Sequence, residues 1–225
     1  MIRNKAILVP ATISAIFVFF VFFIRIIRKT TFKSILSLFI LSLLVFVASL
    51  LVSKFSYRRV ISIHLIIYLT LALVVVDVFT KVLVFCCFTD GDGFSLLPGF
   101  ISIADVRNEY QAAYFQIAGI YMDGRLAGCI KLLAIPLVFL FFKIAKIKFD
   151  NSCIRISLAF ILSTIICTSL DSFIYGYTLD FLVLIPFGAA CDLKDIYAVI
   201  SLGLVLYDAT RQILKQIKLK HKKHC

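Results

Sequence analysis

The chain has 225 residues, of which 62% are hydrophobic and only 16% are charged, and its formal net charge is +12. A soluble core of this size could not hide so much apolar surface, so the composition excludes a water-soluble globular protein. The positive residues lie at the ends of apolar runs and in the C-terminal tail, as in the loops of membrane proteins. The composition therefore predicts a polytopic membrane protein that binds lipid headgroups and not nucleic acid.

Six apolar runs are close to the length of about 20 residues that spans a bilayer as a helix. They are too long and too uniformly apolar for the strands of a membrane barrel. Basic residues, and not a small-residue cleavage pattern, follow the first run, so we expect a retained span and not a removed signal peptide. The predicted helices are Ala6–Ile24, Ile35–Ser53, Val60–Phe85, Leu126–Phe142, Ile154–Leu170 and Ile196–Leu214.

The charges between these helices predict an orientation. The connection after Lys143 and the C-terminal tail are rich in lysine, so the positive-inside rule places both in the cytoplasm. Residues 88–125 and 171–194 then lie on the opposite side, where many of the acidic side chains fall. The last four helices form a consistent unit, whereas basic residues on both sides of the second helix leave the orientation of the first two helices open.

Motifs for several kinds of chemistry are absent from the sequence. The seven cysteines include no Cys-x-x-Cys and no Cys/His pair at zinc spacing in the apolar unit, so we expect no metal site. Nucleotide-binding loops and the motifs of serine hydrolases and zinc proteases are also missing. Carboxylate chemistry without a cofactor remains.

Four aspartates stand at the rims of apolar segments: Asp77, Asp171, Asp180 and Asp195. A carboxylate is costly to bring into hydrocarbon, so one that lies there is by default a functional candidate. Asp77 and Lys81 are four residues apart on one helix face, where they could also simply neutralise each other. We expect the four aspartates to face one shared site.

The segment between the third and fourth predicted helices differs in character from its surroundings. A Pro98-Gly99 break and a short alternating run up to Asn108 predict a small extracytoplasmic β element. Glu109–Phe115 is then apolar enough to lie at the membrane surface, where it could shelter a substrate peptide.

Four motifs follow one another along the chain. They are Asp77-x-x-Thr80-Lys81, Pro98-Gly99-Phe100 leading to Arg107-Asn108 with Ala112-Ala113 and Phe115 beyond, Asp171-x-x-x-x-Gly176-x-x-x-Asp180-Phe181, and a final Asp195 that opens a helix. Together and in this order they resemble the motifs of the lipoprotein signal peptidases, the aspartyl signal peptidases II of bacteria. The similarity covers about residues 60–214.

The resemblance implies an all-α polytopic membrane protein with a four-helix core and a small extracytoplasmic β-cradle, preceded by two N-terminal transmembrane helices. The expected units are an N-terminal extension over residues 1–59, a signal-peptidase-II-like catalytic core over 60–214 and a basic cytoplasmic tail over 215–225. It also implies a membrane aspartyl endopeptidase that removes the signal peptide from prolipoproteins, just before a diacylglyceryl-modified cysteine. We expect a monomer in the bacterial cytoplasmic (inner) membrane, with its active site on the extracytoplasmic side and with prolipoproteins and membrane lipids as partners.

The family's two catalytic aspartates fall on Asp180 and Asp195 by this resemblance. Two carboxylates held close together share a proton, so that one can activate a water while the other donates to the scissile carbonyl oxygen. A register that uses Asp192 as the second catalytic residue is also possible. The supporting positions of the family's motifs are matched by Asp77, Lys81, Asn108 and Asp171.

The chain departs from three of the family's motifs. The family's Asn-x-Gly-Ala-Ala-Phe is lengthened here and lacks its glycine, and its Asn-x-x-Asp-Arg has Thr168 and Ser172 in place of the amide and the guanidinium. Its Phe-Asn-x-Ala-Asp reads Cys191-Asp192-Leu193-Lys194-Asp195, where Lys194 would favour ionisation of Asp195 and Asp192 would oppose it.

Two alternative functions remain. The departures suit a degenerate homologue that binds lipopeptides without cutting them. A small transporter would also use intramembrane carboxylates, but it predicts inverted repeats and polar groups at mid-bilayer, and the sequence shows neither.

Overall fold

The structure is a computed structural model, and it describes residues 8–16, 18, 32–58, 61–88, 93–111, 119–144, 151–185 and 189–223. Residues 8–16 are helical, and the longer helices are α2 (Phe32–Arg58), α3 (Ile63–Cys87), α5 (Gly124–Leu132), α6 (Ala134–Ile144), α7 (Ser152–Tyr175) and α8 (Leu193–Lys223). The strands are β1 (Gly93–Leu97), β2 (Ile101–Asn108), β3 (Thr178–Leu184) and β4 (Ala189–Cys191).

Three helical stretches of the described chain are long and apolar enough to cross a membrane: α3, the α5–α6 stretch and α7. They confirm the predicted third, fourth and fifth spans. The apolar part of α2 is shorter, Phe39–Lys54, and α8 is not among the three. The predicted span Ala6–Ile24 lies partly outside the described residues.

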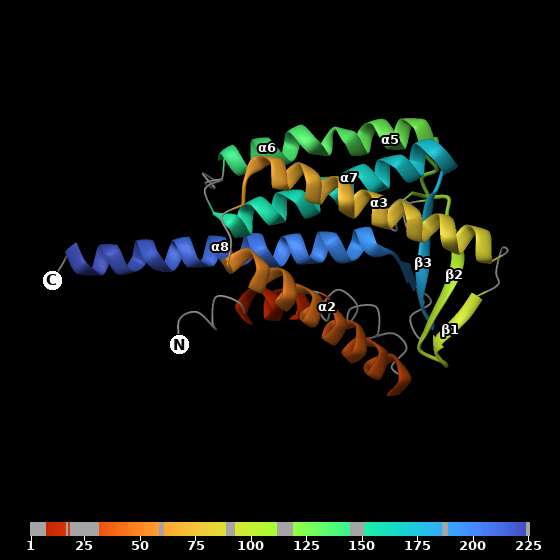
Figure 1. The fold of residues 1–225 in the computed structure, drawn as a ribbon, viewed down its shortest axis with the longest axis horizontal. Helices are drawn as coiled ribbons and strands as arrows, with labels where there is room; N and C mark the ends of the chain where they lie inside the picture. Colours follow the sequence, from red (N-terminus) through yellow and green to blue (C-terminus); the bar gives the residue numbers. More distant parts are fainter. Residues whose placement is uncertain are drawn as a thin grey trace.

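The predicted helix Leu126–Phe142 is divided at Leu133 into α5 and α6. Pro136 has no backbone N–H to donate to the carbonyl four residues earlier, so the regular helical pattern loses a hydrogen bond at this point. The two pieces nevertheless continue in nearly the same direction (Figure 1). The division therefore leaves one stretch that is long enough to span.

Polar residues at the helix ends satisfy the free backbone groups there. Ser62 caps the start of α3 by accepting from the N–H of Leu65, and Asn151 caps α7 in the same way through Cys153. Gly176 ends α7 in the left-handed region, at φ 77°, a conformation that glycine adopts without a steric penalty. This sharp end turns the chain directly into β3.

The sheet is antiparallel throughout, in the order β1-β2-β3-β4. The turn between β1 and β2 has Pro98 and then Gly99 at φ 75°, and the N–H of Phe100 donates to the carbonyl of Leu97 at 2.9 Å. Proline followed by a residue of positive φ is typical of a type II turn. The predicted β element up to Asn108 is thus confirmed as β2, and β1 precedes it.

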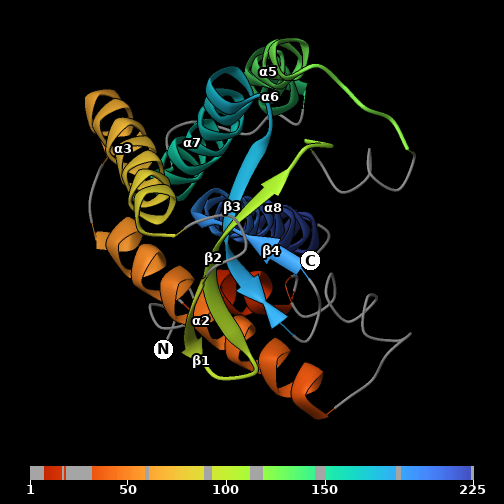
Figure 2. The same ribbon diagram turned by 90° about the vertical axis from the view of Figure 1, so that its right-hand side faces the viewer.

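The sheet lies across one end of the helix bundle (Figures 1 and 2). α7 is the central helix, and it packs against α3, α5 and α8. Because α3 and α7 run into strands and α8 follows one, the C-terminal ends of α3 and α7 and the N-terminal end of α8 lie together at the sheet. Polar residues at these three helix ends are therefore brought to one side of the bundle.

The described part of the N-terminal region packs on the core. α2 contacts α7 and α8, and a buried cluster of Leu41 and Val45 with Ile101 and Leu184 joins α2 to the sheet. The hydroxyl of Ser14 lies 3.3 Å from the carbonyl oxygen of Val199 on α8. The boundaries of the predicted units at residues 59 and 214 stay predictions, and α8 continues as a helix past the second of them.

Candidate active site

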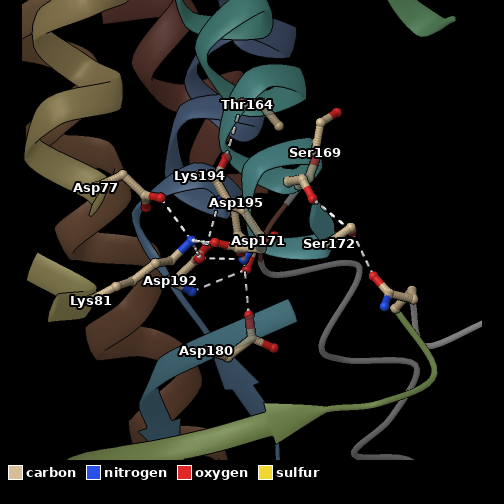
Figure 3. A network of polar contacts seen from close by, with 12 residues as sticks. Asp77, Lys81, Thr164, Ser169, Asp171, Ser172, Asp180, Asp192, Lys194 and Asp195 are labelled. Atoms are coloured by element: carbon tan, nitrogen blue, oxygen red, sulfur yellow. Dashed lines mark hydrogen bonds and ion pairs between the residues drawn. The ribbon is translucent and has the colours of Figure 1, made fainter. Parts of the chain in front are cut away.

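Five aspartates and two lysines gather where the helix ends meet the sheet (Figure 3). α3 contributes two of them, α7 one, β3 one and the start of α8 the remainder. All four aspartates that we expected to share a site lie in this cluster. Its members are Asp77, Lys81, Asp171, Asp180, Asp192, Lys194 and Asp195.

Lys81 is the centre of the buried half of the cluster, with a side chain that is only 1% exposed. Its Nζ atom lies 2.7 Å from Asp77, one helical turn away, and 2.8 Å from Asp192. It also donates to both carboxylate oxygens of Asp171, at 2.9 and 2.8 Å. One ammonium thus compensates three carboxylates that are removed from water.

Lys194 is the centre of the half that faces β3. Its Nζ atom donates to Asp180 Oδ1 at 3.0 Å, pairs with Asp192 and lies 3.4 Å from Asp171. From the sequence we expected Lys194 to favour ionisation of its neighbour Asp195. The Lys194 ammonium does oppose the rise in the pKa of Asp195, as expected. In the described part of the chain the two groups nevertheless form no ion pair, because consecutive residues of a helix point about 100° apart.

Asp192 and Asp195 form the start of α8 and have different surroundings. The N–H of Asp192 donates to the Asp195 carboxylate at 3.1 Å, and the N–H of Asp195 points back to Asp192 at 3.4 Å, which is a capping box. The Asp192 side chain is fully buried between Lys81 and Lys194, whereas the Asp195 residue is exposed. Of the two, only Asp195 is open to water and to a substrate.

One carboxylate oxygen from each of Asp180, Asp192 and Asp195 lies within 4.8 Å of the other two. Such a set could hold a cation, but the ammonium of Lys194 already contacts Asp180 and Asp192. With every group ionised, the five carboxylates would exceed the two ammonium groups. Protons shared among the carboxylates relieve this excess of negative charge.

The pKa values of the two accessible carboxyls are consistent with proton sharing. Burial raises the pKa of Asp180 above its ordinary value, and the Lys194 ammonium opposes this shift. Asp195 precedes the apolar part of α8. Packed protein atoms on its inner side, and next the Asp192 carboxylate, raise the pKa of Asp195 to about 7, although its outer side is open to solvent.

A second polar network joins α5, α7 and the end of β2. The Nζ atom of Lys131 donates to Ser172 Oγ at 2.7 Å, to Gln111 Oε1 at 2.9 Å and to the carbonyl of Thr168 at 3.4 Å. Gln111 in turn donates to the carbonyl of Gly176 at 2.5 Å. Lys131 was not predicted as a site residue from the sequence. The signal was present, since a lone lysine within an apolar span is a functional candidate by default.

Asn108, a predicted supporting residue, lies at the end of β2 opposite Thr178. Its backbone carbonyl accepts a hydrogen bond from the N–H of Gln111 at 3.1 Å. In the described residues no polar contact joins its side chain to the aspartate cluster. Its backbone therefore positions Gln111, which reaches the network of Lys131.

The model of the protein family described as Signal peptidase (SPase) II matches residues 69–211, which is more than half of the chain. The chain belongs to the signal peptidase II family. It is a membrane aspartic endopeptidase of the kind that processes lipoprotein precursors, and its resemblance to that family in sequence is confirmed. Among curated proteins, none matches the chain.

Two solved structures share the fold of this signal peptidase II, and each is described as a bacterial membrane enzyme structure obtained by the in meso method, at 1.9 and 2.3 Å resolution. The first has a TM-score of 0.53 at 20% sequence identity and covers 64% of this chain and 91% of its own. The second has a TM-score of 0.51 at 19% identity and covers 67% and 90%. About two thirds of the chain thus has a fold that is known from solved structures.

Two departures of this signal peptidase II from the family's motifs meet at one place in the structure. Thr168 and Ser172 stand where the motif has an amide and a guanidinium, and both contact the ammonium of Lys131. Gln111 precedes the Ala-Ala pair where the motif has glycine, and it has a positive φ of 66°. In this chain a cation, Lys131, and a residue of positive φ, Gln111, thus lie at these departures from the motifs.

Proposed function

We propose that Asp180 and Asp195 are the catalytic pair of this signal peptidase II. The observation that carries the proposal is the difference in exposure within the aspartate cluster. Asp77, Asp171 and Asp192 have side chains that are at most 3% exposed and are paired with Lys81. Asp180 is 13% exposed and Asp195 is open, so these two can reach a water and a peptide.

In the proposed reaction, a water held between the two carboxyls attacks the scissile carbonyl carbon. Asp180, whose ionised form the Lys194 ammonium favours, accepts a proton from that water, and Asp195 donates its proton to the carbonyl oxygen. When the tetrahedral intermediate collapses and the C–N bond breaks, Asp180 gives its proton to the leaving nitrogen. Asp195 recovers a proton from the hydroxyl group, so both residues return to their starting states.

The remaining cluster residues have positioning roles in this proposal. Asp77, Lys81 and Asp171 lock the ends of α3 and α7 together, and Asp192 links them to the first turn of α8. Removing one partner from a buried ion cluster of this kind destabilises the protein. The intact cluster fixes the positions of the three helix ends relative to one another. Asn108 acts through its backbone at the start of the segment that leads from β2.

The proposed substrate is a prolipoprotein that carries a diacylglyceryl-modified cysteine, cut on the N-terminal side of that cysteine. We propose that the aspartate cluster lies at the extracytoplasmic face of a bacterial cytoplasmic membrane. The lysines of the sequence after Lys143 and in the C-terminal tail support this orientation by the positive-inside rule. The acyl chains can then remain in lipid while the scissile bond lies at headgroup level beside the sheet. We propose a monomer in contact with membrane lipids, since one chain supplies both carboxylates.

The test is cleavage of a diacylglyceryl-modified prolipoprotein peptide by the purified protein in detergent, beside the Asp180→Asn and Asp195→Asn variants. We expect the parent protein to release the signal peptide before the modified cysteine, and both variants to bind the peptide without cutting it. Binding without cleavage by the parent protein would instead establish a degenerate lipopeptide-binding homologue. Undiminished cleavage by Asp195→Asn would exclude the proposed pair.

A further inference from the structure

Lys194 is a buried lysine directly beside the proposed catalytic pair, at a position where the motif of this family has alanine. Its side chain is only 4% exposed, although it belongs to the first turn of α8 next to the open residue Asp195. Thr164 of α7 donates to the backbone carbonyl of Lys194 at 3.1 Å and so holds this turn in place. The side chain is consequently directed into the cluster and not toward solvent.

The contacts of Lys194 distinguish the two members of the pair. Its ammonium donates to Asp180 Oδ1 at 3.0 Å, but it makes no ion pair with Asp195 among the residues that the structure describes. Lys81, the other buried ammonium, pairs with carboxylates outside the proposed catalytic pair. Lys194 is therefore the lysine of the cluster that hydrogen-bonds one catalytic carboxylate, whereas its charge acts on the other without a direct contact.

Other charged groups face the same space from each packed element. Carboxylates oppose the effect of Lys194 on Asp180, and the second buried ammonium adds to it. Among the described residues, the ammonium of Lys194 is the group that forms an ion pair with the Asp180 carboxylate, and none of these other groups does so. The groups are Asp77 and Lys81 from α3, Lys131 from α5, Asp171 from α7, and Asp192 and Asp195 from α8.

We infer that Lys194 is a positioning residue that decides which of the two catalytic carboxyls carries the shared proton. Its ammonium holds Asp180 in the ionised form that accepts a proton from water, and the proton remains on Asp195, which donates to the scissile carbonyl. This inference rests on the proposed function and adds to it which carboxyl is the base and which is the acid. A positive charge at hydrogen-bonding distance lowers the proton affinity of a carboxyl by about one to three orders of magnitude, which is enough to decide which of the two carboxyls is ionised.

The decisive variant is Lys194→Gln, which keeps hydrogen-bonding capacity but removes the charge. Lys194→Arg is compared with it because it keeps the charge. We expect the acidic limb of kcat against pH to move upward by about 1 to 2 pH units in Lys194→Gln, because the neutral side chain no longer favours ionised Asp180. The acidic limb of Lys194→Arg should stay near that of the parent protein. The same is expected of the matched control Lys54→Gln, at an exposed position of α2. An unmoved limb in folded Lys194→Gln would overturn the inference.

A second measurement needs no change at Lys194. Carboxyl titration by NMR of the parent protein, labelled with 13C at the aspartate carboxyls and assigned with Asp180→Asn and Asp195→Asn, should show Asp195 losing its proton at a higher pH than Asp180. The reverse order would refute the inference even if Lys194→Gln failed to fold. Failure of the proposed function is distinct, since the parent protein would then not cleave the peptide at all.

Discussion

Lys81 on α3 donates to both carboxylate oxygens of Asp171 on α7, 90 residues away, at 2.9 and 2.8 Å. The same ammonium also pairs with Asp77 and Asp192, and Lys194 shares Asp171 and Asp192 with it. Breaking a buried ion pair by removing one partner costs about 3–5 kcal/mol, because an uncompensated charge is left behind. This single lysine therefore ties the two helix ends to the first turn of α8.

Replacing Lys81 by methionine should destabilise the protein by about 3–5 kcal/mol, with the loss visible as a lower thermal midpoint in detergent. The control is Lys54→Met, which removes an exposed lysine of α2 and should leave the midpoint nearly unchanged. An unchanged midpoint in Lys81→Met would mean that the three carboxylates are neutral or hydrated without the lysine.

Cleavage should show a bell-shaped dependence on pH. Asp195 must be protonated to donate, and its pKa is raised to about 7, so activity is present below this pH and is lost as the pH rises through it. Asp180 must be ionised to accept a proton, and burial raises its pKa, so activity is lost at the acidic side earlier than for an ordinary aspartate. The measurement is kcat against pH with the lipopeptide. A rate that stays level well above neutral pH would contradict the role of Asp195.

Much of the membrane core could be predicted from the sequence, because hydropathy and chain length together determine where a helix can cross a bilayer. α3 and α7 lie where they were expected, and the Pro98-Gly99 turn introduces β2 as predicted. The division between α5 and α6 was not predicted, although Pro136 was visible. The packing of α2 on α7, α8 and the sheet depends on contacts between distant segments, and no local pattern indicates them.

The candidate site was predicted in part for a similar reason. Aspartates at the rims of apolar helices must meet other polar groups, which is why Asp77, Asp171, Asp180 and Asp195 came together as expected. The direction in which the Lys194 side chain points could not be deduced from its sequence neighbour Asp195, since side chains one residue apart on a helix diverge. Its partner Asp180 arrives from β3, and only the fold brings the two together.

Asp192 and Asp195 differ in burial, so their asparagine variants should differ in effect. Asp195→Asn should lower kcat by at least about 100-fold, the scale of a lost general acid, while thermal stability is retained. Asp192→Asn should keep measurable cleavage, with the basic limb of its pH profile moved to lower pH, because the Asp192 carboxylate raises the pKa of Asp195. Retained processing in Asp195→Asn together with loss in Asp192→Asn would mean that the second catalytic residue is Asp192.

Lys131 holds the end of β2 against α7 through Gln111 and Ser172. Lys131→Met removes these charged hydrogen bonds and should cost about 1.5–3 kcal/mol in stability. We expect KM for the lipopeptide to rise more than kcat falls, because Gln111 belongs to the segment Glu109–Phe115 that we expect to shelter the substrate. Arg125→Met, an exposed position of the same helix, is the matched control. Equal kinetics in the two variants would remove Lys131 from substrate binding.

The helix of residues 8–16 approaches α8 closely at Gly203. A Cβ atom added there would lie 1.9 Å from Ser14 Oγ and 2.9 Å from the carbonyl oxygen of Pro10. Gly203→Ala should therefore lower the thermal midpoint, since overpacking of a close contact costs about 1–3 kcal/mol. Because Gly203 lies about two helical turns along α8 from Asp195, kcat should change little.

A double-mutant cycle separates this contact from a general effect of alanine on α8. Ser14→Gly removes the nearest atom, so the pair Ser14→Gly with Gly203→Ala should recover part of the stability that Gly203→Ala alone loses. The carbonyl of Pro10 remains in place, and for that reason the recovery is incomplete. Strictly additive losses in the two single variants and the pair would show that residues 8–16 do not pack on Gly203 in the membrane.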